Sequence, residues 1–122
     1  CLQRRDGAPT NTALLGISRK IPYDQWEWKD LGRFLGGPNF IQLPDGRWIA
    51  CGRLSNHGPE KKTKTVVCEL DVTKGALTPL LDLPSSGDSS YPGLVWHDNQ
   101  LWISYYSSHE GKAAIYIARV KL

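Results

Sequence analysis

The sequence contains no methionine, few cysteines and no long apolar run. A membrane-spanning helix needs about 20 consecutive, mostly apolar residues, and no segment approaches that length, so we expect no membrane span. The first residues also lack the basic and then apolar pattern of a secretory signal. The chain starts without methionine, inside a predicted strand, so an upstream targeting segment is not excluded and the sequence leaves the compartment open.

The three cysteines, Cys1, Cys51 and Cys68, form no C-x-x-C pair and stand beside no histidine at metal-ligand spacing. We therefore expect buried free thiols in strands. Nothing in the sequence indicates a metal or a cofactor.

Charge of one sign is also scarce, because 15 lysines and arginines stand against 12 acidic residues, for a net charge of +3. The basic residues are scattered except for the run Lys-Lys-Thr-Lys at 61–64, with which no aromatic residues alternate. Proteins that bind single-stranded nucleic acid combine cations with aromatic rings on which bases stack. We interpret the run as a solvated hairpin turn and expect no nucleic-acid partner.

Helical periodicity is missing as well. Twelve glycines and eight prolines interrupt short apolar runs, and no segment keeps apolar residues at intervals of three and four. The five tryptophans and five tyrosines favour pleated, half-buried strands. The sequence therefore predicts an all-β protein.

An internal repeat organises the chain. Residues 38–41, PNFI, align with residues 92–95, PGLV, and the same overlay sets Trp48-Ile49 on Trp102-Ile103 without a gap. Residues 64–70 then correspond to residues 112–118 after a shorter loop. Each unit reads as strand, Asp-bearing turn, Trp-containing strand, loop and strand, and a fourth strand follows the first copy at 77–81.

The length of this unit, about 50 residues, is typical of propeller blades. We assign residues 1–35 to the last three strands of a preceding blade, 36–84 to a complete four-stranded antiparallel blade, and 85–122 to a final blade without its fourth strand. Repeat units bury their faces against their neighbours. The sequence thus predicts a partial β-propeller, the C-terminal fragment of a protein whose missing N-terminal blades are its partners.

Two segments, GGPNFIQLPDGRW at 36–48 with Gly52-Arg53, and GDSSYPGLVWHD at 87–98 with LWISYY at 101–106, resemble the sialidase-type, BNR-repeat-like six-bladed propellers of the neuraminidase superfamily. In that family three arginines hold the carboxylate of sialic acid. A tyrosine assisted by a glutamate attacks the anomeric carbon, and an aspartate is the acid/base. A neutral tyrosine suits an acidic sugar, because a carboxylate nucleophile would be repelled by the substrate's own carboxylate.

The resemblance implies that Arg4 and Arg53 are the second and third arginines and that Tyr91 is the nucleophile. The internal repeat independently places Arg4 and Arg53 at equivalent strand ends. Arginine suits this role because its planar fork binds a carboxylate bidentately. Arg5 stays open as an alternative to Arg4, because neighbours on a strand face opposite sides.

Two further polar residues flank the same predicted rim. Asn39 follows the Gly-Gly-Pro turn and Asp88 lies in the loop before Tyr91, so we predict both as substrate-binding residues. Their alternative role is to form turns. Structural alternatives exist for two others as well: a packed loop anchor for Tyr91, and capping of strand-end carbonyls or pairing with a nearby acid for Arg53.

Together these residues predict part of an exo-glycosidase that hydrolyses a terminal, acidic sugar of a glycan through a tyrosine-linked intermediate. The acid/base aspartate, the supporting glutamate and the first arginine would belong to other blades, so the fragment alone is expected to be inactive. The alternative is a non-catalytic carbohydrate-binding or interaction propeller, because Pro92 follows Tyr91 where the family has a small polar residue.

Overall fold

The computed structural model describes residues 1–7, 10–57 and 62–122, and within these residues it contains ten strands and no helix. The described residues accordingly include no helix that is long and apolar enough to cross a membrane. The strands are β1 (Leu2–Gln3), β2 (Leu14–Ile17), β3 (Glu27–Asp30), β4 (Leu35–Gln42), β5 (Trp48–His57), β6 (Lys62–Asp71), β7 (Ala76–Asp82), β8 (Ser89–His97), β9 (Gln100–Ser107) and β10 (Ala114–Val120). The all-β prediction is confirmed.

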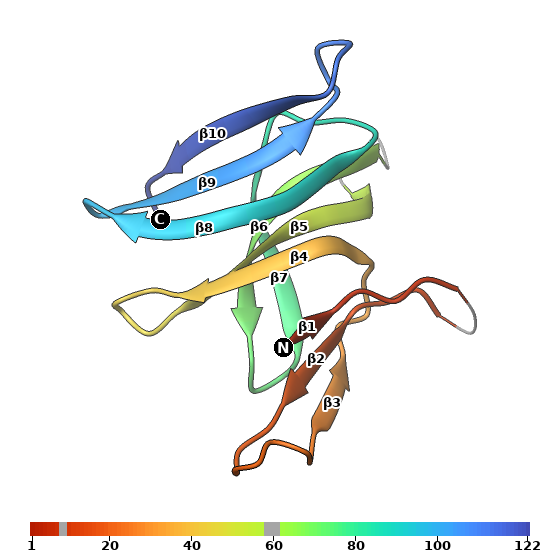
Figure 1. The fold of residues 1–122 in the computed structure, drawn as a ribbon, viewed down its shortest axis with the longest axis vertical. Coiled ribbons are helices and arrows are strands. Elements are labelled where there is room, and N and C mark those ends of the chain that lie inside the picture. Colours follow the sequence, from red (N-terminus) through yellow and green to blue (C-terminus); the bar gives the residue numbers. More distant parts are fainter. Residues whose placement is uncertain (8–9, 58–61) are drawn as a thin grey trace.

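The strands form three antiparallel sheets, none of them closed: β1-β2-β3, β4-β5-β6-β7 and β8-β9-β10. The sheets follow one another in chain order, and β4 lies between β1 and β8 (Figure 1). This is a partial β-propeller with one four-stranded blade and parts of two others, as the repeat predicted. The first residue of the basic run, Lys61, lies outside the described residues, whereas residues 62–64 begin β6 rather than form a turn.

The two inner hairpins differ by one residue in the length of their turns. Phe40 lies opposite Ala50 in the first hairpin, whereas Leu94 lies opposite Ile103 in the second. Overlaying Phe40 on Leu94 therefore brings Ala50 onto Ile103. The ungapped overlay of Trp48 on Trp102 is wrong by one residue, because the second hairpin closes through the tight pair Asp98-Asn99, both at positive φ (49° and 55°).

This shift changes which residues are equivalent on the second strands of the two blades. With the shorter turn, Trp102 takes the place of Ile49 and Tyr106 takes the place of Arg53. The inner strands keep the predicted overlay, because β4 and β8 bulge at matching places, between Gly36 and Asn39 and between Ser90 and Gly93.

The middle sheet buries both of its faces, since successive side chains of a strand point to opposite sides. One face contributes Ala50, Val66 and Cys68 to a core shared with β1–β3, and the other contributes Ile49, Cys51 and Val67 to a core shared with β8–β10. The predicted thiols are free; Cys51 and Cys68 are buried, and only Cys1, beside the edge strand β1, is exposed.

The outer face of the last sheet is left open by the described residues. Val95, Ile115 and Ile117 are 60%, 75% and 63% exposed on it. The same face carries Trp102, over whose ring the guanidinium of Arg119 lies 5.3 Å from the centroid. The equivalent face of the middle sheet is buried, so the last sheet presents a blade surface that nothing in the described chain covers.

Candidate functional site

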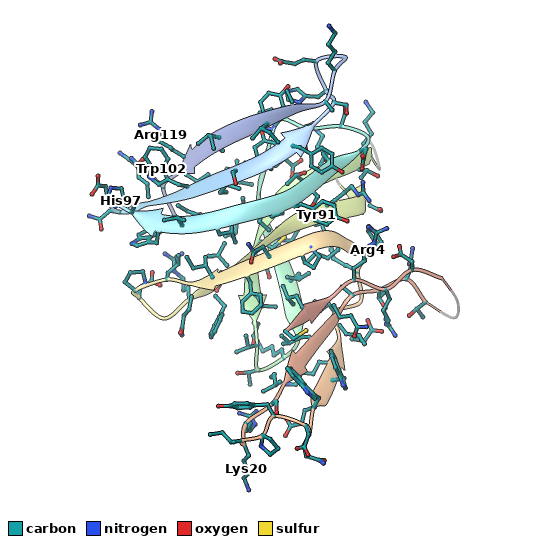
Figure 2. All side chains as sticks on the ribbon, viewed as in Figure 1. Arg4, Lys20, Tyr91, His97, Trp102 and Arg119 are labelled. Carbon is teal, nitrogen blue, oxygen red and sulfur yellow. The ribbon has the colours of Figure 1, made fainter. Side chains whose placement is uncertain are left out.

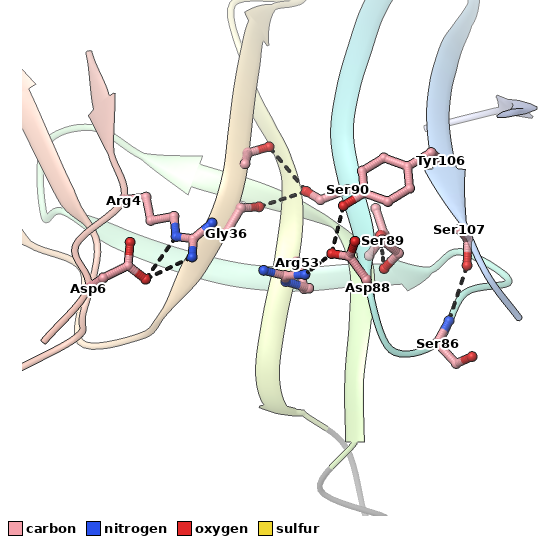
Figure 3. Close-up of polar contacts among 12 residues, drawn as sticks. Arg4, Asp6, Gly36, Arg53, Ser86, Asp88, Ser89, Ser90, Tyr106 and Ser107 are labelled. Atoms are coloured by element: carbon pink, nitrogen blue, oxygen red, sulfur yellow. Dashed lines mark hydrogen bonds and ion pairs between the residues drawn. The ribbon is translucent and has the colours of Figure 1, made fainter. Parts of the chain in front are cut away.

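The predicted arginines and tyrosine lie near one another. Arg4 adjoins Tyr91 (Figure 2), and Arg53 is joined through Asp88 to Tyr106, on which Tyr91 stacks (Figure 3). Arg4 follows β1, Arg53 lies in β5, Asp88 directly precedes β8, Tyr91 lies in β8 and Tyr106 in β9. We call these five residues the rim cluster. The cluster combines residues from all three sheets: Arg4 follows a strand of the first, Arg53 lies in the second, and Asp88 precedes the third. The packing of the sheets therefore brings these residues together.

Asp88 is the centre of the rim cluster. Its Oδ1 accepts a hydrogen bond from Arg53 Nη1 and another from the Tyr106 hydroxyl, both at 2.7 Å (Figure 3). The pKa of Asp88 is lowered, first by the Tyr106 hydroxyl and then by Arg53 and Arg4. The same hydrogen bond raises the pKa of Tyr106, because a phenolate beside this carboxylate would be repelled. Asp88 therefore joins Arg53 to Tyr106 on the aromatic side of the site.

Tyr91 stands at a backbone position that favours glycine. It lies in the β8 bulge at φ 50°, after Ser90 at φ 143°, and the repeat aligns it with Gly37, which is also at φ 50°. A side chain in this left-handed region costs about 1 kcal/mol. Ser90 holds the bulge by donating its hydroxyl to the carbonyls of Gly36 and Gly37, at 2.7 and 3.1 Å. Strained positions of this kind are concentrated at functional sites.

The ring of Tyr91 is presented to solvent. Tyr91 is 66% exposed and stacks on Tyr106, with ring centroids 6.1 Å apart and planes inclined by 18°. Tyr91 also adjoins Arg4 (Figure 2), whose pKa is raised first by Asp6 and further by the Tyr91 hydroxyl. The tyrosine thus interacts with a cation and with a second aromatic ring.

Arg4 and Arg5 face opposite sides of the chain, and only Arg4 belongs to the rim cluster. The Arg4 guanidinium donates to Asp6 at 3.0 and 2.8 Å and lies 5.4 Å from the centroid of the Phe34 ring. Arg5 instead donates to the carbonyl of Thr12 and to Asp30. The geometry therefore favours Arg4 over Arg5 as the arginine beside Tyr91.

Asn39 joins the two inner strands to each other. Its Nδ2 donates to the carbonyl of Pro92 at 2.8 Å, and its Oδ1 accepts from the backbone N–H of Phe40 at 2.8 Å. These bonds fix β4 against β8 beside the two bulges. A contact of Asn39 with substrate stays a prediction, and its contacts in the described chain are structural.

Tyr106 and Phe34 were not predicted as site residues. The signal for Tyr106 was available, because a two-residue turn at Asp98-Asn99 places it close to opposite Tyr91, and Tyr105 and Tyr106 must face opposite sides of β9. Nothing in the sequence marked Phe34, which lies just before β4 and meets Arg4 only through the packing of two sheets.

The rim cluster has the composition of an anion site. Two permanently charged guanidinium groups and two phenols lie at an exposed rim, and each arginine already holds a carboxylate of the chain. A cavity of about 470 Å³ elsewhere, lined by Tyr23, Trp26, Phe40 and Trp48 among others, shares no residue with it. No group of three metal-ligating side chains occurs among the described residues.

Comparison with known proteins adds no family assignment: neither a protein-family model nor a curated protein sequence matches the chain. The resemblance to sialidase-type propellers therefore stays a prediction from the residues that carry it.

Proposed function

We propose that the chain supplies the carboxylate-binding part of the active site of a sialidase-like exo-glycosidase that hydrolyses a terminal, acidic sugar. The observation that carries this proposal is the meeting of Arg4, Arg53 and Tyr91 in one exposed cluster. These residues are distant in sequence, and they are the three that the family resemblance selects.

In this proposal Arg4 and Arg53 bind the sugar carboxylate through charge-assisted hydrogen bonds. The Tyr91 oxygen forms a bond to the anomeric carbon while its proton passes to a base, and the bond to the leaving oxygen breaks as that oxygen takes a proton from the acid/base aspartate. Water then releases the sugar from the tyrosine. The base, the acid/base aspartate and the first arginine would come from further blades of the same protein, and the open face of β8–β10 supports this partner.

The second candidate is a non-catalytic carbohydrate-binding propeller. It is favoured by the exposed ring of Tyr91 and its stacking on the half-buried Tyr106, since amphipathic aromatic side chains are typical of recognition surfaces. Both candidates use the same rim cluster, and they differ only in whether the Tyr91 oxygen reacts.

The test is hydrolysis of a fluorogenic α-sialoside by the full-length gene product and by its Tyr91→Phe variant. We expect Tyr91→Phe to lower turnover by about a hundredfold or more, because it removes the nucleophilic oxygen, while sialic acid still binds. Tyr23→Phe is the matched control, since Tyr23 is also exposed (54%) but lies outside the rim cluster.

Equal turnover in wild type and Tyr91→Phe would show that Tyr91 is not the nucleophile. Binding of sialic acid without any hydrolysis by the wild type would favour the second candidate. Absence of both binding and hydrolysis would overturn both.

A further inference from the structure

In the structure the carboxylate of Asp88 is bound to Arg53, the group that would bind the carboxylate of a ligand. Arg53 Nη1 lies 2.7 Å from Asp88 Oδ1, within the range of a strong charge-assisted hydrogen bond. From this we propose that Asp88 is a built-in competitor at the rim cluster: it holds Arg53 while the site is empty, and the carboxylate of the ligand displaces it. This inference rests on the proposed function in taking Arg53 as a ligand-binding residue.

The two partners differ in their freedom to move. The Arg53 side chain is 17% exposed and belongs to β5, in the middle of a four-stranded sheet. The Asp88 side chain is 73% exposed and lies outside the strands, directly after Gly87 at φ 58°. Arg53 is therefore the fixed partner. When Asp88 turns into water, it loses an exposed ion pair with Arg53, which contributes at most about 1 kcal/mol, and the hydrogen bond from the Tyr106 hydroxyl. Water can replace both partners, because the Asp88 side chain is largely exposed.

The backbone around Asp88 is anchored on both sides, so displacement needs only its side chain to move. Before it, the backbone N–H of Ser86 donates to the Ser107 hydroxyl at 3.3 Å, and after it the hydroxyls of Ser89 and Thr65 lie 2.9 Å apart. Tyr91, three residues on, is held by the Ser90 hydrogen bonds described above. The tyrosine can thus stay in place while Asp88 leaves Arg53.

Charge gives the reason for displacement. Arg4 pairs with Asp6, which lies beside the rim cluster, and Arg53 pairs with Asp88, so each of the two cations of the empty site is balanced by one carboxylate of the chain. A ligand carboxylate that entered beside an unmoved Asp88 would be repelled by it. When Asp88 turns away, Arg53 becomes available and the repulsion falls with distance and solvent screening.

Asp88→Asn tests this inference because the amide keeps the shape of the side chain and removes its charge. The binding of N-acetylneuraminic acid to the full-length gene product should become about three- to fivefold tighter, as expected for loss of an exposed competing charge. Asp88→Ala should act in the same direction, and it covers the case in which asparagine still holds Arg53. Asp45→Asn is the matched control, since it removes a similar pair with Arg47 (2.7 Å) at a distant turn and should leave affinity unchanged.

Arg53→Gln tests whether the tighter binding of the Asp88 variants depends on Arg53. It should weaken binding, and adding Asp88→Asn to it should restore nothing, because the competitor acts through Arg53. Weaker or unchanged binding in both Asp88 variants would overturn the competitor role and indicate that Asp88 positions Arg53. Failure of every variant and of the wild type to bind would overturn the proposed function as well, so the two failures are distinguishable.

Discussion

Tyr91 combines an exposed ring with a backbone conformation that favours glycine. Replacing it with alanine or with glycine removes the same ring contacts, so the difference between the two variants measures the backbone strain, less the greater conformational entropy that glycine loses on folding. We expect Tyr91→Gly to be more stable to denaturant than Tyr91→Ala by about 1 kcal/mol. The φ of 50° at this position is the reason.

The matched pair is Val95→Ala and Val95→Gly on the same strand, where Val95 is similarly exposed (60%). There glycine should be the less stable variant by about 0.5 to 1 kcal/mol, as in an ordinary strand. The same order at both positions would contradict the assignment of strain to Tyr91.

The cysteines give a second prediction at the scale of single residues. Burial raises the pKa of Cys51 and of Cys68 to about 12, so at pH 8 only about one thiol in ten thousand is a thiolate at either position. Cys1 is exposed. A thiol reagent should therefore modify one cysteine quickly in the folded chain and all three in denaturant. Rapid modification of three thiols without denaturant would contradict the two buried positions.

At the scale of elements, the strand pattern was predictable because short apolar runs and turn residues are local signals. The four strands of residues 36–84 were expected from sequence, including the outer strand with Pro79, which is β7. The register of the last hairpin was not predicted correctly. The prediction aligned the two tryptophans, whereas the two-residue turn at Asp98-Asn99 sets the register in the structure. A shift of one residue moves each side chain of β9 to the other face of the sheet.

That register error also explains which part of the site was missed. Arg4 follows β1 at the same rim, and the corrected alignment places Arg53 and Tyr106 at equivalent ends of β5 and β9. The first two were found because the residue type repeats, whereas the third was hidden because tyrosine replaces arginine. The pairing of Asp88 with Arg53 depends on a loop packing against another sheet, and no local pattern predicts such a contact.

At the scale of the whole molecule, the chain stacks sheets so that each face of the middle blade is buried, yet the face carrying Val95, Ile115 and Ile117 is open. Its equivalent on the middle sheet includes Ile49 and Cys51, both fully buried. Apolar patches of this kind mark interaction surfaces. We therefore expect this face of the propeller to be covered by another sheet, either from the same protein or from a second copy of the chain.

The 122-residue chain on its own should therefore self-associate through this face as concentration rises. Sedimentation velocity should show a weight-average mass above that of the monomer. Ile117→Lys should return it toward the monomer, because a charge placed on this face must be desolvated on association. Thr78→Lys is the matched control, since it adds the same charge at an exposed position of β7, on another sheet. A wild-type chain that stays monomeric over the whole concentration range would show that the open face is stable in water, and the argument for a covering sheet would then fail.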